Sequence, residues 1–313
     1  MFNNKIVVTS STFAKTAALK QKLLQNFSHV EFNQTGRVLT TPELIPLLQD
    51  AEGALVGLDP IDEELLKHCP KLKIVSKFGV GIDNIDTRAM EGRKIALGWT
   101  AGVNRYAVAE HALGLILGSL RNLFVTSEKL RHGEWVKNGG TTLFNKTVGI
   151  IGLGHVGSEL ALLLSPFRCR IIAHDIADKT SFCAPHHICQ VDLPTLLQES
   201  DIVSIHVPLT DKTFHLLNKS RFALMKPTAW LINTSRGPVL HQKDLKAALQ
   251  EGKIAGAALD VFEEEPVQDL EFLGLPNLVA TAHTAGNAKE AVLAMGESAL
   301  RHLVAFFGQP TSR

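Results

Sequence analysis

A glycine-rich turn between an apolar strand and a helix governs how the middle of the chain can fold. Residues 147–151 have the pattern of a buried strand, and the turn after them carries Gly152, Gly154 and Gly157 in a GxGxxG arrangement. The first glycine permits a tight turn, the second a close approach to a pyrophosphate, and the third close packing of helix on sheet. The N–H groups that begin the helix can bind phosphate. The pattern predicts a dinucleotide site, with His155 and Val156 among its contacts.

The following strand ends in an acidic residue that indicates which dinucleotide is bound. Asp175 lies eighteen residues after Gly157, at the end of a predicted strand over 170–174. A carboxylate at this place hydrogen-bonds the adenosine ribose and repels a 2′-phosphate, which favours NAD over NADP. A glycine turn alone is a common structural feature. Strand, helix and acid together predict a bound NAD.

Strand and helix patterns alternate along most of the chain. We expect strands at 5–9, 30–32, 54–56, 73–77 and 95–97, and in a second series at 147–151, 170–174, 202–206, 229–233, 254–259 and 277–280. Helical spacing covers 13–27, 42–49, 62–69, 104–125, 156–165, 192–199, 219–225, 241–250 and 288–307. Such alternation is typical of parallel sheets covered on both faces, and 313 residues favour two domains. We predict an α/β fold with two Rossmann-like or flavodoxin-like parallel-sheet domains.

Composition excludes several other classes of protein. With 32 basic and 31 acidic side chains the formal net charge is +1, which predicts neither a nucleic-acid nor a membrane partner. The start of the chain lacks a signal-peptide pattern, and four cysteines make no disulfide framework, so we expect a cytoplasmic protein. Cys183, His186, His187 and Cys189 are close in sequence but have no partner ligands at zinc spacing. We therefore expect a polar loop there and no metal.

Three segments at predicted strand ends carry candidate catalytic groups. Arg236 follows one strand, an acidic cluster ending at Glu265 follows the next, and His283 follows the last. Each type of residue is common without a catalytic role, but together they suit hydride transfer at a carbinol carbon. A guanidinium fork can hold a carboxylate, a histidine can exchange the hydroxyl proton near neutral pH, and a carboxylate beside it stabilises the imidazolium.

The segments GLGHVG, NTSRG, DVFEEEP and HTAG, in this order, resemble the D-isomer-specific 2-hydroxyacid dehydrogenase family. The resemblance implies that Arg236 anchors the substrate, that Glu265 is the partner of His283, and that His283 is the acid/base. It implies that Asp260 contacts the nicotinamide carboxamide and that His206, Val207 and Pro208 lie along the adenosine. The NTSRG and HTAG segments add Thr234 and Gly286 as cofactor contacts. Ala282 departs from the family pattern, where proline often precedes the histidine, and predicts a less rigid loop.

The resemblance also implies the domain organisation and the oligomer. We expect a substrate-binding domain of residues 1–100 plus 287–313, an NAD-binding Rossmann domain of residues 101–286, and a cleft between the two. The helix expected at 104–125 is apolar on nearly all sides, which predicts burial against another domain or subunit. The family implies a homodimer formed through the NAD-binding domain and this helix.

The substrate is expected to bind a loop that follows the strand at 73–77. Backbone N–H groups of Val80 and Gly81 suit a carboxylate, and Asn104 matches the family's interdomain segment. Lys77 is basic, as in the phosphoglycerate dehydrogenase branch, and favours D-3-phosphoglycerate, a substrate of serine biosynthesis, with Arg105 as a possible second charge. If the protein is a phosphoglycerate dehydrogenase, we expect a short form of that enzyme, without a C-terminal regulatory domain. The alternatives are that Lys77 is a surface lysine, that the substrate is glyoxylate, hydroxypyruvate or another short 2-oxo acid, or that the protein is an NAD-sensing corepressor-like binding protein.

Overall fold

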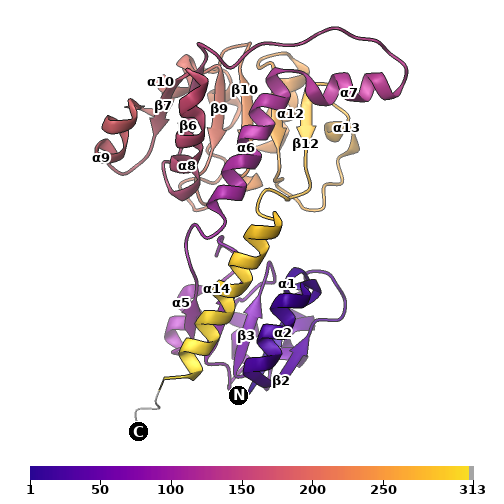
Figure 1. Cartoon of the computed structure of the whole chain (residues 1–313), viewed down its shortest axis with the longest axis vertical. Helices are drawn as coiled ribbons and strands as arrows, with labels where there is room; N and C mark the ends of the chain where they lie inside the picture. The colour runs from indigo at the N-terminus through magenta and orange to yellow at the C-terminus, as the bar shows by residue number, and fades with distance from the viewer. Residues whose placement is uncertain (310–313) are drawn as a thin grey trace. The chain divides into compact units, whose positions relative to one another are not determined.

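The computed structural model describes residues 1–309 and divides them into two compact units. Unit 1 comprises Met1–Asn104 together with the segment from Asn287, and unit 2 comprises Arg105–Gly286. Each unit contains one sheet in which all neighbouring strands are parallel (Figure 1). The predicted fold class, with two parallel-sheet domains, is confirmed. Residues 310–313 of the expected segment 287–313 lie outside the described residues.

The sheet of unit 1 has five strands in the order β2-β1-β3-β4-β5. Its strands are β1 (Phe2–Val8), β2 (Phe27–Phe32), β3 (Gly53–Val56), β4 (Ile74–Lys77) and β5 (Ala96–Gly98). Its helices are α1 (Ser11–Lys15), α2 (Ala17–Asn26), α3 (Thr41–Leu48), α4 (Glu63–Lys67), α5 (Thr87–Gly92) and α14 (Lys289–Phe307). The helix expected over 13–27 is divided because Thr16 has an extended backbone.

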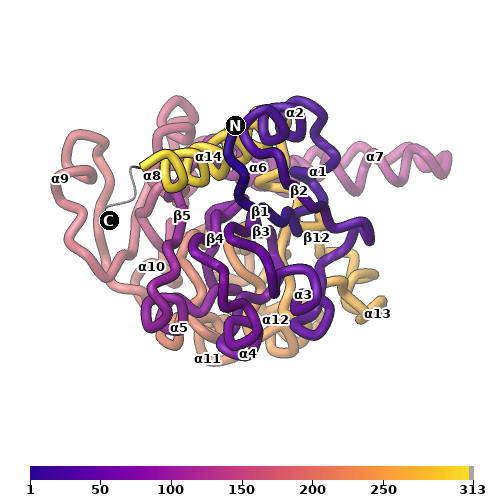
Figure 2. The backbone as a smooth tube through the Cα atoms, turned by 90° about the horizontal axis from the view of Figure 1, so that it is seen from below, coloured from indigo at the N-terminus to yellow at the C-terminus, as the bar shows by residue number. Residues whose placement is uncertain are grey.

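Both faces of this sheet are buried, as strand alternation requires. On one face Ile6 and Val8 pack with residues of α1, α2 and α14, and on the other Val7 packs with residues of α3, α4 and α5. Figure 2 shows α2 and α14 on one side of β1, β3 and β4, with α3, α4 and α5 on the other. The C-terminal helix therefore completes the fold of the N-terminal unit.

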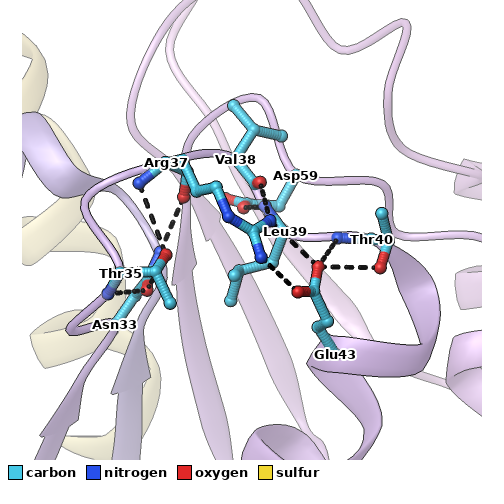
Figure 3. A network of polar contacts seen from close by, with 8 residues as sticks. All are labelled: Asn33, Thr35, Arg37, Val38, Leu39, Thr40, Glu43 and Asp59. Atoms are coloured by element: carbon cyan, nitrogen blue, oxygen red, sulfur yellow. Dashed lines mark hydrogen bonds and ion pairs between the residues drawn. The ribbon is translucent and has the colours of Figure 1, made fainter.

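A polar network closes the carboxyl edge of this sheet (Figure 3). Asp59 is 2% exposed, and its carboxylate accepts hydrogen bonds from the Thr9 hydroxyl at 2.5 Å and from the Leu39 N–H at 2.8 Å. Asn33, after β2, donates to the backbone oxygens of Thr9 and Arg37. These bonds tie the loop that precedes α3 to the ends of β1 and β3.

The sheet of unit 2 has seven strands in the order β12-β11-β10-β9-β6-β7-β8. Its strands are β6 (Thr147–Ile151), β7 (Arg170–His174), β8 (Cys189–Gln190), β9 (Ile202–Ile205), β10 (Trp230–Asn233), β11 (Gly256–Leu259) and β12 (Leu278–Ala280). Its α-helices are α6 (Arg105–Leu120), α7 (Leu123–Arg131), α8 (His155–Leu164), α9 (Thr180–Cys183), α10 (Leu193–Glu199), α11 (Lys219–Phe222), α12 (Gln242–Gln250) and α13 (Leu270–Leu273). Strand β8 was not predicted, because two residues give no periodicity.

The helices of unit 2 cover both faces of its sheet. Residues of α6, α8 and α9 form one buried cluster with the strands, and residues of α10, α11, α12 and α13 form the other. Strand order reverses between β6 and β9, so their carboxyl ends form the switch point where doubly wound sheets bind ligands. The predicted glycine turn lies at this point.

The long helix expected over 104–125 is in fact two helices. Asn122, at φ +52°, adopts the left-handed conformation that asparagine tolerates, and α7 leaves the direction of α6 there. Half of the residues of α6 are buried, whereas α7 has no buried residue. Within residues 1–309 no single helix is long and apolar enough to cross a membrane; α6 and α7 pass that test only as a pair bent by 64°.

Candidate active site

The glycine turn of unit 2 has a backbone that only glycine allows at two positions. Gly152 has φ +96°, and a Cβ there would lie 2.8 Å from the His206 carbonyl oxygen. A Cβ at Gly157 would lie 1.9 Å from the Gly152 carbonyl oxygen, so the helix packs directly on the turn. Gly154 precedes α8, with no side-chain cap and open space where a Cβ would be. The turn therefore offers N–H groups and room for a pyrophosphate.

Asp175 is fixed next to this turn. One carboxylate oxygen accepts the Leu153 N–H at 2.8 Å, the other accepts the Ala177 N–H at 2.9 Å, and the side chain is 13% exposed. Each oxygen retains a lone pair for a ribose hydroxyl. The turn, the helix start and this carboxylate together fit the adenosine diphosphate part of NAD.

The segment after β9 lies beside the same turn. The His206 ring bonds the Ser204 hydroxyl at 2.8 Å, and burial lowers the pKa of His206 to about 3, so the ring is neutral at pH 7. The Val207 side chain lies beside Gly152, and the Pro208 carbonyl accepts the Thr213 hydroxyl at 2.6 Å. Further along, after β10, the Thr234 hydroxyl is buried without a hydrogen-bond partner in the described part of the chain. Such a hydroxyl can bond a ligand.

Arg236 lies on a short turn that follows β10. Asn233 holds this turn, because its amide donates to the Arg236 carbonyl at 2.9 Å and its oxygen accepts the Ser235 N–H at 3.0 Å. A Cβ at Gly237 would lie 1.9 Å from the backbone of Phe262, so the turn packs directly on the segment that leads to Glu265. Close packing at Gly237 therefore places Arg236 beside the acidic segment.

His283 and Glu265 form the pair that the sequence predicted. The distance from His283 Nδ1 to Glu265 Oε2 is 2.7 Å, and the other Glu265 oxygen accepts the Phe262 N–H at 3.0 Å. Partial burial by itself would raise the pKa of Glu265. The bonds from His283 and Phe262, with the charges of His283 and Arg236, outweigh it, so the pKa lies below its ordinary value. Glu265 is therefore a carboxylate at neutral pH and orients the imidazole.

Asp260 holds the loop that carries His283. Its side chain is fully buried and accepts the Thr281 hydroxyl at 2.6 Å and the Thr284 and Ala285 N–H groups at 2.8 Å each. The His283 N–H donates to the Asp260 carbonyl at 2.8 Å. These bonds hold the loop despite Ala282, and hold His283 at its left-handed φ of +51°. The contact between Asp260 and the nicotinamide remains a prediction, as does the contact of Gly286.

His111 had no role in the sequence predictions and lies beside Asp260. Its Nε2 is 3.2 Å from the Thr281 hydroxyl and 3.6 Å from the Asp260 carboxylate. His111 belongs to α6 and Asp260 follows β11, so no sequence spacing relates them. The tertiary structure thus supplies a polar partner to a carboxylate buried behind the loop of His283.

In unit 1 one of the predicted substrate residues, Lys77, is placed differently from what its type suggested. Lys77 is 3% exposed, so its interpretation as a surface lysine is wrong. Its Nζ donates to the Gly57 carbonyl and to Asn84 Oδ1, both at 2.6 Å. Val80 and Gly81 are half-buried in the loop after β4, and Asn104 is the last residue of the unit before α6. Lys77 thus helps to hold the base of the loop.

The cysteine- and histidine-rich segment shows no metal-binding geometry. In residues 1–309 no three His, Cys, Asp or Glu side chains are grouped so that they could hold a metal ion. Cys183 is buried, with a thiol pKa raised by burial, and Cys189 is exposed. His186 packs against the Phe182 ring. The segment runs from the end of α9 to the start of β8, the edge strand of the unit 2 sheet.

A doubly wound sheet with a dinucleotide turn at its switch point, and an imidazole–carboxylate pair beside an arginine, defines a nicotinamide-dependent dehydrogenase. Residues 113–285 match the model of the NAD-binding domain of D-isomer-specific 2-hydroxyacid dehydrogenases. The chain belongs to this family and is an NAD-dependent oxidoreductase. The resemblance seen in the sequence is confirmed.

The chain matches most of the length of two of the similar proteins named here and about half the length of a third. The chain is 42% identical over 272 residues to a glyoxylate reductase from Thermofilum pendens, which covers 84% of this chain and 80% of that protein. It is 36% identical over 279 residues to a D-3-phosphoglycerate dehydrogenase from Methanocaldococcus jannaschii, covering 88% of this chain and 53% of that protein. The structure of Aquifex aeolicus D-lactate dehydrogenase with NAD and lactic acid aligns with a TM-score of 0.85 at 27% identity, over 96% and 95% of the two chains.

These residues can carry out the acid/base part of a dehydrogenase reaction. Bound NAD supplies or accepts the hydride. The Glu265 carboxylate accepts a hydrogen bond from the N–H at Nδ1 of His283, which leaves Nε2 as the atom that exchanges a proton with a substrate oxygen. The Arg236 guanidinium can bind a carboxylate through two parallel hydrogen bonds. Asp260 keeps the loop of His283 in place.

Proposed function

We propose that this enzyme reduces a short, unphosphorylated 2-oxo acid of the glyoxylate or hydroxypyruvate class to the D-2-hydroxy acid. Arg236 and the N–H groups of Val80 and Gly81 bind the substrate carboxylate, and His283 gives the proton to the C2 oxygen. The main observation that supports this choice of substrate is the buried position of Lys77. A phosphate-binding lysine must present its ammonium to solvent or ligand, whereas Lys77 bonds Gly57 and Asn84 inside unit 1.

Two further observations support this choice over D-3-phosphoglycerate. The second expected cation, Arg105, stacks on the Tyr106 ring, bonds its hydroxyl at 2.6 Å and lies 3.7 Å from Glu159. Several similar proteins, including the one from Thermofilum pendens, are named glyoxylate reductase. 3-Phosphohydroxypyruvate is the second candidate, because the chain is also similar to a phosphoglycerate dehydrogenase.

The substrate can be identified by following NADH oxidation by the purified protein with glyoxylate, hydroxypyruvate, pyruvate and 3-phosphohydroxypyruvate. We expect kcat/KM for glyoxylate or hydroxypyruvate to exceed that for 3-phosphohydroxypyruvate by at least about tenfold, since a phosphate without an accessible cation loses a charge-assisted hydrogen bond. A preference for 3-phosphohydroxypyruvate would refute the proposal and favour the second candidate. NADPH in place of NADH is the control for the role of Asp175.

We also propose that the enzyme is a homodimer formed through an arm, which consists of α7 and the segment 132–146 that leads to β6. Figure 1 shows α7 and this segment standing away from the sheet of unit 2. Large apolar side chains are exposed along this arm, namely Leu123 (56%), Phe124 (44%), Leu130 (54%), Trp135 (77%) and Phe144 (53%). Monomeric proteins rarely expose so many large apolar groups together. A second copy of the arm would cover them.

Replacing Leu130 and Trp135 by serine tests the dimer. We expect the wild type to elute as a dimer in size-exclusion chromatography with light scattering and the double variant to shift to monomer, because the exchange removes the apolar area that stabilises the contact. Leu270→Ser is the matched control, since Leu270 is 77% exposed on α13 and does not belong to the arm. A monomeric wild type, or a double variant that stays dimeric, would contradict this interface.

A further inference from the structure

The loop after β4, which carries Val80 and Gly81, is anchored at both ends. At its start the Phe78 N–H donates to the Val56 carbonyl at 2.8 Å. At its end the Asn84 amide donates to the Asp59 carbonyl at 2.6 Å, and Lys77 donates to Asn84 Oδ1. Lys77 and Asn84 thus join the loop to the turn after β3. None of these three bonds is made by the peptide groups in the middle of the loop.

The middle of the loop is held by a residue outside it. Trp99, directly after β5, donates its indole N–H to the Val80 carbonyl at 2.8 Å. The residue that follows Trp99 is itself held, because the Thr100 hydroxyl lies 2.9 Å from Nε2 of His302 on α14. The neighbouring Gly98 has no room for a side chain, since a Cβ there would lie 2.6 Å from the Cβ of His302. The indole is therefore a fixed donor, placed by the packing of α14 on β5.

The planarity of the peptide bond turns this contact into a constraint on Gly81. In a trans peptide the carbonyl and the following N–H point in opposite directions. With the Val80 carbonyl bonded to Trp99, the Gly81 N–H points away from the indole. No residue in the range 1–309 accepts a hydrogen bond from the backbone N–H of Val80 or Gly81. Both donors remain available to an anion.

We propose that Trp99 is a positioning residue that keeps the Val80–Gly81 peptide oriented for the substrate carboxylate. Without the indole N–H, the glycines on either side of Val80 allow this peptide to rotate. A rotated peptide presents its carbonyl oxygen, the negative end of the dipole, in place of the N–H. The carboxylate would meet repulsion instead of a donor. This inference rests on the proposed function, because it assigns the loop to a carboxylate.

The variant Trp99→Phe removes the N–H and keeps an aromatic ring. We expect KM for the preferred 2-oxo acid to rise about three- to tenfold, the effect of losing one neutral hydrogen bond, with kcat within about twofold of the wild type. KM for NADH should stay unchanged, since the glycine turn is in unit 2. The inhibition constant of oxamate, an unreactive carboxylate, should rise by the same factor as KM. Trp230→Phe, at the tryptophan that begins β10 and packs against Gly256 in unit 2, is the matched control.

An unchanged KM and oxamate affinity in Trp99→Phe would overturn the inference. So would a uniform change in kcat, both KM values and the melting temperature, because that would make Trp99 a packing residue only. Failure of the proposed function has a different signature: the wild type would turn over no short, unphosphorylated 2-oxo acid. Oxamate binding to the wild type and to Trp99→Phe with NADH present, measured by calorimetry, would then still test the loop.

Discussion

Replacing His283 by glutamine is expected to lower kcat by about 10²- to 10⁴-fold, the contribution of a positioned general acid. Glutamine keeps a polar group of similar length but exchanges no proton near neutral pH. The dissociation constant of NADH should stay within about twofold of the wild type, because His283 lies on the loop after β12 and the glycine turn follows β6. Steady-state kinetics and a fluorescence titration with NADH would measure the two effects separately.

The control for this variant is His68→Gln, at a histidine half exposed on the surface of unit 1. That variant should retain wild-type kcat. If His283→Gln kept more than about a tenth of the wild-type kcat, another group would have to supply the proton. If it lost NADH binding as well, the loop of His283 would be supporting the fold of unit 2, and the catalytic assignment would lose its basis.

Replacing Arg236 by lysine is expected to lower kcat/KM for the 2-oxo acid by about 10²- to 10³-fold. Lysine preserves the positive charge but cannot form the two parallel hydrogen bonds that a guanidinium offers to a carboxylate. The turn that carries Arg236 is rigid, since Gly237 packs on the Phe262 backbone and Asn233 bonds the Arg236 carbonyl. A shorter reach therefore cannot be recovered by movement of the backbone.

The effect of Arg236→Lys should appear in KM and kcat together, because the same contact holds the ground state and orients the carbonyl for reaction. Arg170→Lys is the matched control, at an arginine paired with Glu199 and 55% exposed. A loss of less than about fivefold in kcat/KM would show that charge alone suffices at this position. The bidentate role of Arg236 would then be rejected.

Much of the site follows from local sequence signals. Gly152, Gly154 and Gly157 are recognisable because the backbone geometry of a phosphate-binding turn excludes side chains, and Asp175 because strand length fixes its distance from them. The family resemblance implied Glu265 as the partner of His283, and both follow strands of one parallel sheet, whose carboxyl ends share an edge. Their distance of 2.7 Å agrees with that prediction.

Other features could not be predicted because they depend on contacts between distant segments. The break between α6 and α7 depends on the left-handed backbone of Asn122, which the apolar pattern across 104–125 conceals. Lysine is a residue type that is common on surfaces and in anion sites. Only the position of Lys77 in the folded unit shows that it bonds Gly57 and Asn84. Asp260 and His111 are far apart in sequence and meet only through the packing of α6 on the sheet.

The family resemblance implied the acid/base pair, whereas the sequence pattern by itself determined the parallel α/β architecture and the NAD turn. These depend on periodicity and on backbone constraints that act over a few residues. Only the tertiary structure decided that Asp260 holds the loop of His283, that Lys77 is buried, and that Trp99 holds the Val80 carbonyl. The reason is that a hydrogen bond between separate elements depends on where packing places them, and neither partner carries a local signal of the other. The choice of substrate rests on such bonds, whereas the class of reaction does not.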